Sequence, residues 1–85
     1  MQTYVLINCT PGSERKIISK LKKMTEVIEV NGIMGKYDIF VKISARGPQQ
    51  IDSAVLKLRD IVGITASYSM PVLYGQGGTI VDEEK

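Results

Sequence analysis

The chain has 85 residues, of which 44% are hydrophobic and 24% are charged, and its formal net charge is +2. This length allows one domain, and the composition is that of a globular protein and not of a disordered one. The net charge is too small to indicate a nucleic-acid or membrane partner, and no apolar run approaches the roughly 20 residues that span a bilayer.

The cysteine and histidine content narrows the functional classes. Cys9 is the one cysteine, so it cannot form an internal disulfide, and the N-terminus lacks the features of a signal peptide. Both features predict a cytoplasmic protein. The chain has no histidine, the commonest general base and metal ligand. Because no spacing of carboxylates, Lys, Tyr or Arg indicates a catalytic cluster instead, we expect no enzyme, no metal and no cofactor.

The first strand is predicted over residues 3–9. Tyr4 and Leu6 share one of its faces, and Val5 and Ile7 share the other. A strand that is apolar on both faces is usually central in a sheet and covered on both sides.

A first helix follows the turn at residues 10–13. Either Thr10 caps it with Pro11 at the first helical position, or Ser13 caps it slightly later. An apolar stripe at helical spacing consists of Ile17, Ile18, Leu21 and Met24. The basic residues opposite it are Arg15, Lys16, Lys20, Lys22 and Lys23. We interpret this basic side as a solvated face and not as a nucleic-acid site.

The most informative segment covers residues 27–44, where two strand-like runs are joined by a connection at residues 31–36. Gly32 and Gly35 allow a positive φ or a close approach there, which predicts a tight hairpin or a bulge. The second run alternates as a strand with two different faces does. One face holds Tyr37, Ile39, Val41 and Ile43, and the other holds Asp38, Phe40, Lys42 and Ser44. Asp38 places a carboxylate at the mouth of this hairpin, where we expect any small polar ligand to bind.

A second helix starts at Pro48, whose missing N–H costs nothing in a first helical turn. Its apolar stripe consists of Ile51, Ala54, Val55, Leu58 and Val62. Gly63 stands where a left-handed residue ends a helix. Arg46, in the loop before this helix, is interpreted as a solvated charge.

The last strand is predicted over residues 64–74. Pro71 cannot donate a ladder hydrogen bond, so this strand lies at an edge or bulges there. One face holds Ile64, Ala66, Tyr68, Met70 and Val72, and the other holds Thr65, Ser67, Ser69 and Pro71. Small hydroxyls on one face are typical of a half-exposed surface, and they equally suit hydrogen bonds to a polar ligand. We expect one domain over residues 1–74 and a Gly-rich C-terminal extension over residues 75–85, flexible or docked on a partner.

The order strand, helix, hairpin, helix, strand predicts an α+β fold of the ferredoxin-like βαββαβ type, with a four-stranded antiparallel sheet and both helices on one face. The first and third strands are central in that arrangement. Phe40 and the alternate residues of the first strand then place apolar groups on the uncovered face, and a partner usually closes such a face. We therefore expect a homodimer, joined sheet against sheet or edge to edge.

Three segments make the sequence resemble the stand-alone effector-binding (RAM) domain of the Lrp/AsnC (feast/famine) transcriptional regulators. The opening strand, Pro-Gly turn and Lys-rich helix of that family are similar to YVLINCTPGSERKIISKLKKM. Its Gly-x-Tyr/Phe-Asp hairpin with the following strand is similar to GKYDIFVKI, and its closing strand to VGITASYSMPVL. The resemblance covers about residues 3–74 and depends on the order and spacing of the three segments together.

The resemblance implies a non-catalytic amino-acid sensor that dimerises through its sheets, assembles dimers into larger rings and binds a free amino acid in a cleft between dimers. The hairpin match places Gly35, Tyr37 and Asp38 at the ligand, and the closing-strand match adds Ser67 and Ser69. Asp38 would accept from the ligand ammonium, and the hairpin backbone and the serines would donate to its carboxylate. Two other interpretations stay open at the hairpin, that Asp38 caps the turn and that Tyr37 belongs to the core.

Full-length regulators of this family carry an N-terminal helix-turn-helix, whereas this chain begins directly at the sensor domain. We therefore expect no direct nucleic-acid binding, and an effect on transcription only through oligomers with a DNA-binding relative. Two other functions stay open: a pure assembly module without a ligand, and a small ferredoxin-like enzyme such as an acylphosphatase-like hydrolase or a dimeric monooxygenase. The hydrolase would need an arginine in a phosphate-binding loop with an asparagine partner, and Arg15 and Asn31 do not have that spacing.

Overall fold

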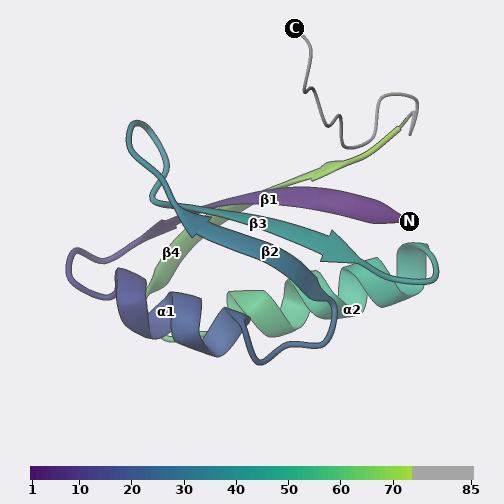
Figure 1. The fold of residues 1–85 in the computed structure, drawn as a ribbon, viewed down its shortest axis with the longest axis horizontal. Coiled ribbons are helices and arrows are strands. Elements are labelled where there is room, and N and C mark those ends of the chain that lie inside the picture. Colours follow the sequence, from purple (N-terminus) through teal and green to yellow (C-terminus); the bar gives the residue numbers. More distant parts are fainter. Residues whose placement is uncertain (74–85) are drawn as a thin grey trace, which may run out of the picture.

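The computed structural model describes residues 1–73, which form one four-stranded antiparallel sheet with two helices on one of its faces (Figure 1). The elements are β1 (Gln2–Cys9), α1 (Glu14–Leu21), β2 (Val27–Gly32), β3 (Ile39–Ser44), α2 (Pro48–Arg59) and β4 (Ile64–Pro71). The strands lie in the order β2-β3-β1-β4, so β1 and β3 are central. This arrangement confirms the ferredoxin-like α+β fold predicted from the sequence. The extension at residues 75–85 lies outside the described residues, and the domain boundary at residue 74 stays a prediction.

The core lies between the sheet and the two helices. Alternate residues of the central strands are fully buried there, namely Val5, Ile7, Ile39, Val41 and Ile43. They pack against buried residues of the two helices, namely Ile17, Leu21, Ile51, Ala54, Val55 and Leu58. Because side chains alternate across a strand with a period of two, burying one set leaves the other set on the opposite side of the sheet.

Neither α1 nor α2 covers this second side, which we call the open sheet face. Leu6 of β1 pairs with Phe40 on one side and with Tyr68 on the other, and paired residues of antiparallel strands point the same way. The rings of Tyr4 and Phe40 lie 5.6 Å apart between centroids, and Tyr68 is 51% exposed. The open sheet face of the single chain therefore carries a group of apolar and aromatic side chains that its helices leave uncovered, as the alternation of the central strands predicted, and Lys42 lies beside this group.

Both predicted helical stripes extend beyond their helices. Met24 lies beyond the end of α1, where it is half-buried against the core. Val62 lies beyond the end of α2 and is 83% exposed, so its predicted place in the stripe is wrong. The chain has already left the helix there, and helical spacing no longer sets the direction of the side chain. Ser13 directly precedes the first residue of α1, which agrees with the later of the two predicted starts.

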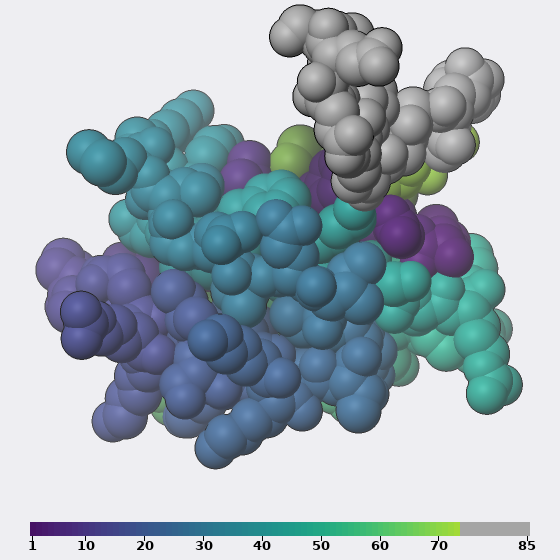
Figure 2. Space-filling view, viewed as in Figure 1, coloured from purple at the N-terminus to yellow at the C-terminus, as the bar shows by residue number. Residues whose placement is uncertain are grey.

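The hairpin connection between β2 and β3 is shifted from its predicted boundaries. It covers residues 33–38 instead of 31–36, because β2 continues through Gly32 and β3 starts after Asp38. Gly35 has a φ of 123°, whereas Gly32 is paired within the sheet and does not have a positive φ. The hairpin connection projects from the body of the molecule at the upper left of the space-filling view (Figure 2).

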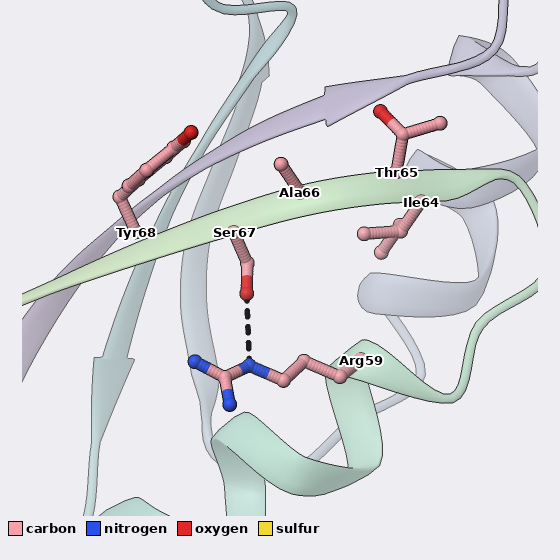
Figure 3. Close-up of a pocket in the computed structure, with 6 residues that line it drawn as sticks. All are labelled: Arg59, Ile64, Thr65, Ala66, Ser67 and Tyr68. Atoms are coloured by element: carbon pink, nitrogen blue, oxygen red, sulfur yellow. Dashed lines mark hydrogen bonds between the residues drawn. The ribbon is translucent and has the colours of Figure 1, made fainter.

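A β-bulge changes the direction of two side chains at the start of β4. The register with β1 shifts at Thr65, which has no partner in the ladder. Ile64 therefore turns towards the core, and the prediction that it shares a face with Tyr68 is wrong. Thr65 lies on the opposite side of the strand from Ser67 (Figure 3), so their predicted common face is also wrong. β4 is at the edge of the sheet, as Pro71 predicted.

Gly63 joins the turn after α2 to the start of α1. Its φ is 104°, the left-handed conformation that the sequence predicted, and its carbonyl accepts a hydrogen bond from the Thr10 N–H at 2.8 Å. A Cβ atom on Gly63 would lie 3.1 Å from Ser13 Oγ and 3.2 Å from Ile17 Cδ1. A side chain is therefore disfavoured both by the backbone conformation and by the close approach of α1.

We expect Gly63→Ala to lower the free energy of unfolding by about 1–3 kcal/mol, since it combines left-handed strain with a tight contact. Urea denaturation followed by circular dichroism measures this change. Gly32→Ala is the matched control, because its Cβ would meet only Ile18 Cδ1 at an ordinary 3.7 Å and its φ is not positive. An equal loss of stability in the two variants would contradict this account of Gly63.

Candidate functional site

Asp38 attaches the hairpin connection to the end of β1. Its N–H donates to the Ile7 carbonyl at 2.9 Å, and its carboxylate Oδ2 accepts from the Cys9 N–H at 2.9 Å. Its carbonyl accepts from the Ile33 N–H at 2.9 Å, which closes the connection. Asp38 therefore has a structural role. No N–H or O–H group of residues 1–73 donates to its other carboxylate oxygen, Oδ1, and the Cys9 thiol lies beside the carboxylate.

Tyr37 links the hairpin connection to β4 across the end of β1. Its ring meets the ring of Tyr68 edge-on, with the centroids 5.5 Å apart and the planes at 67°. The Lys36 ammonium lies 5.9 Å from the centroid of the Tyr37 ring. Tyr37 is half-buried and does not belong to the buried core. The interpretation that placed Tyr37 in the core is therefore wrong. Gly35, Tyr37 and Asp38 thus lie together on one projecting segment.

The two predicted serines lie apart from that segment. Ser67 and Ser69 pair with buried residues of β1, so their side chains point to the helix side of the sheet. Ser67 Oγ accepts a hydrogen bond from Arg59 Nε at 3.0 Å (Figure 3). Asp38 bonds to Ile7 on one side of β1, and Ser67 pairs with Ile7 on the other side. Asp38 and Ser67 are therefore separated by two inter-strand spacings, about 10 Å. One chain thus does not bring all five predicted residues into one pocket.

Two shallow hollows lie along β4, and Arg59 borders both of them. The first has a volume of about 430 Å³ and is lined by Arg59, Ile64, Thr65, Ala66, Ser67 and Tyr68 (Figure 3). The second has about 420 Å³ and is lined by Thr3, Ile51, Asp52, Val55, Leu56, Arg59, Ser69 and Pro71. Arg59 was not among the predicted site residues, because a cation in the last turn of a helix is explained by the helix dipole alone. The packing of α2 against β4 places it beside Ser67.

The Cys9 thiol does not have the setting of a reactive nucleophile. Burial raises its pKa, and the charges of Asp38 and Glu14 act in the same direction, although a hydrogen bond with Ser13 opposes them. A reactive thiol needs a lowered pKa instead.

Residues 1–73 contain neither a metal-binding cluster nor a membrane-spanning helix. In this part of the chain no three His, Cys, Asp or Glu side chains lie close enough together to hold a metal ion. Neither of its helices has the length and hydrophobicity needed to cross a membrane. Hydrogen-bonding groups and single charges are therefore what the end of the sheet near the hairpin connection offers to a ligand.

Residues 2–79 match the family model described as the Lrp/AsnC ligand binding domain. The chain belongs to the Lrp/AsnC family. A curated relative, the HTH-type transcriptional regulator FL11 of Pyrococcus furiosus, is 30% identical over 70 residues, which are 82% of this chain and 46% of FL11. The chain thus spans about half the length of the curated relatives that it matches.

Solved structures agree with this assignment. The hypothetical protein PHS023 from Pyrococcus horikoshii superposes with a TM-score of 0.79 at 26% identity, over 93% of this chain and 98% of that chain. The transcriptional regulator NMB0573 from Neisseria meningitidis, solved in complex with L-Met, superposes with a TM-score of 0.80 at 18% identity, over 92% of this chain and 53% of that chain. The resemblance to the RAM-type domain is confirmed, and so is the fold.

We expect the Cys9 thiol to react with iodoacetamide with a pH midpoint above that of an ordinary thiol, since its pKa is raised. Mass spectrometry of the alkylated chain at a series of pH values measures this midpoint against glutathione. Asp38→Asn should lower the midpoint, because the substitution removes a negative charge that opposes formation of the thiolate. A wild-type midpoint at or below that of glutathione would contradict the raised pKa.

Proposed function

We propose that this Lrp/AsnC ligand-binding domain is a non-catalytic, cytoplasmic amino-acid sensor whose ligand binds at the hairpin connection. The observation that carries the proposal is the Oδ1 oxygen of Asp38, which accepts from no N–H or O–H group of residues 1–73 although Oδ2 and the backbone hold the residue in place. A ligand ammonium group needs such an acceptor. Gly35 has no side chain and a positive φ, which leaves the backbone accessible beside it. The L-Met complex of NMB0573 supports a free amino acid as the ligand class.

The proposed ligand site is shared between protomers. An α-amino acid carries its ammonium and its carboxylate on the same carbon, so the protein groups that bind them must lie close together. In one chain, Asp38 and Ser67 are separated by about 10 Å. We therefore place Ser67 and Ser69 of one protomer opposite Gly35, Tyr37 and Asp38 of another.

The open sheet face supports a homodimer as the first step of this assembly. Its apolar side chains are Tyr4, Leu6, Phe40, Tyr68 and Met70, and a contiguous apolar patch of this kind is typical of a protein interface. Dimers joined in this way then assemble further, which brings the β4 edge of one dimer to the hairpin connection of another. A DNA-binding relative of the same family is a possible member of such assemblies, and would connect the ligand to transcription.

The second candidate function is a pure assembly module without a ligand, which the open sheet face supports equally well. Among the described residues, no contact favours the hydrolase that the sequence left open. The Asn31 amide donates to Glu29 Oε2 at 3.0 Å, and Arg15 is exposed on α1. The two remaining candidates differ in whether a small molecule stabilises the assembled protein.

We expect at least one of the twenty amino acids to raise the apparent melting temperature in differential scanning fluorimetry, and Asp38→Asn to abolish that rise. Asparagine keeps a carbonyl oxygen for the Cys9 N–H and removes the charge that the ligand ammonium needs. Asp38→Ala also removes the bond to Cys9, which costs about 1–3 kcal/mol of stability, and is therefore a less specific variant.

Asp60→Asn is the control for this experiment, because it removes an exposed carboxylate at the end of α2 by the same substitution, and Asp60 lines neither hollow along β4. It should retain the full rise. An unchanged response in Asp38→Asn would remove Asp38 from the site. A flat panel from an intact oligomer would instead favour the assembly module.

We expect Phe40→Glu to weaken the dimer by about 100-fold in dissociation constant, since it places a charge in the middle of the open sheet face. Sedimentation equilibrium measures the constant, and circular dichroism checks that the monomer stays folded. Val62→Glu is the matched control, since that side chain is 83% exposed in the turn after α2. A dimer of unchanged stability in Phe40→Glu would place the interface elsewhere.

A further inference from the structure

The guanidinium group of Arg59 is held in one orientation by a hydrogen bond, which an arginine with only a solvated charge does not require. Its Nε–H donates to Ser67 Oγ at 3.0 Å, which fixes the plane of the guanidinium against β4. Figure 3 shows the two terminal nitrogens extending beyond this bond, and Arg59 forms no ion pair within residues 1–73. One donor is therefore used for orientation, while four N–H donors stay available to a ligand.

The helix dipole accounts for a positive charge at this position but not for this geometry. Lys57 lies in the same last turn of α2, where its charge is favourable too, and it pairs with Glu26 at 3.5 Å. A lysine at position 59 would interact with the helix dipole as favourably as the arginine does. A planar fork held by its Nε, with its other N–H groups free, is instead the arrangement that binds a carboxylate through two parallel hydrogen bonds.

The hollow beside Arg59 is shallow, but its size is that of a small-molecule site. Its volume of about 430 Å³ is within the range of such sites, and Ile64 and the hydroxyl group of Ser67 face Arg59 across it (Figure 3). The hollow adjoins the hairpin connection, because the ring of Tyr68 contacts Tyr37. A ligand held here by its carboxylate would lie on the β4 edge, which is the edge that the proposed assembly brings to a second hairpin.

We infer that Arg59 binds the carboxylate of the ligand, and that Ser67 is a positioning residue that orients its guanidinium. The inference rests on the proposed function and assigns the two ends of the amino acid to different protomers. Asp38 of one protomer binds the ammonium, and Arg59 of the other binds the carboxylate. It restricts the ligand to molecules with a free carboxylate, so that an amino-acid amide is excluded.

The chain has three arginines, namely Arg15, Arg46 and Arg59. One sample therefore tests the inference directly, with two of them as internal controls. The full chain, labelled with ¹⁵N, is titrated with each of the twenty amino acids, with the corresponding amino-acid amides and with the corresponding 2-oxo acids. The Nε–H signal of each arginine is followed. We expect the Arg59 signal to shift saturably with carboxylates and not with amides, while those of Arg15 and Arg46 stay in place.

Substitutions give the second measurement. Arg59→Gln should weaken binding of the amino acid about 10- to 100-fold, because it removes a charged pair of hydrogen bonds. Arg59→Lys should recover part of the affinity, because the charge returns without the fork. Arg46→Gln removes the same charge from the loop before α2 and should leave the affinity unchanged.

The outcomes separate the inference from the proposed function. If amino acids and their amides bind equally well, or if Arg59→Gln binds as the wild type does, the inference is overturned while amino-acid sensing stands. If only 2-oxo acids bind and they shift the Arg59 signal, the inference stands and the amino-acid ligand is rejected. If no carboxylate shifts that signal, the role of Arg59 is overturned, whatever binds at the hairpin connection.

Discussion

The central strands of this sheet are apolar on both sides, while the two helices cover only one of them. Packing the alternate residues of β1 and β3 under the helices leaves Tyr4, Leu6 and Phe40 on the open sheet face. In a chain of 85 residues, few residues are available to form a second layer over the open sheet face. A second protomer is the cover that we propose, and burial of this face would then contribute to the stability of the oligomer. The ligand site that we propose depends on this assembly, since its two halves would come from different chains.

A single residue connects this fold to its candidate chemistry. Asp38 uses its N–H, its carbonyl and one carboxylate oxygen to hold the hairpin connection against the end of β1. The carboxylate is thereby held in place before a proposed ligand arrives. Such preorganisation reduces the entropy cost of binding. On the edge strand, Ser67 has a comparable effect on Arg59.

Much of the fold was predictable, and the errors have common causes. The helices and strands were found in the right order, and the buried residues of β1, β3 and α2 followed from their periodicity. Val62 was misplaced because a helical period was extended past the end of the helix. Ile64 and Thr65 were misplaced because a bulge of one residue reverses an alternation that the sequence continues without interruption. The hairpin connection was shifted by two residues because Gly32, although a glycine, pairs within β2.

Local patterns in the chain were enough for the element order, the faces of the central strands and the likeness to the Lrp/AsnC family. These features depend on residues that are neighbours in sequence, within one strand, one helix or one hairpin. The direction of Ser67 towards α2, its bond with Arg59 and the bond of Asp38 to Cys9 required the folded chain. They depend on the register between strands that are far apart in sequence, and no local period carries that information.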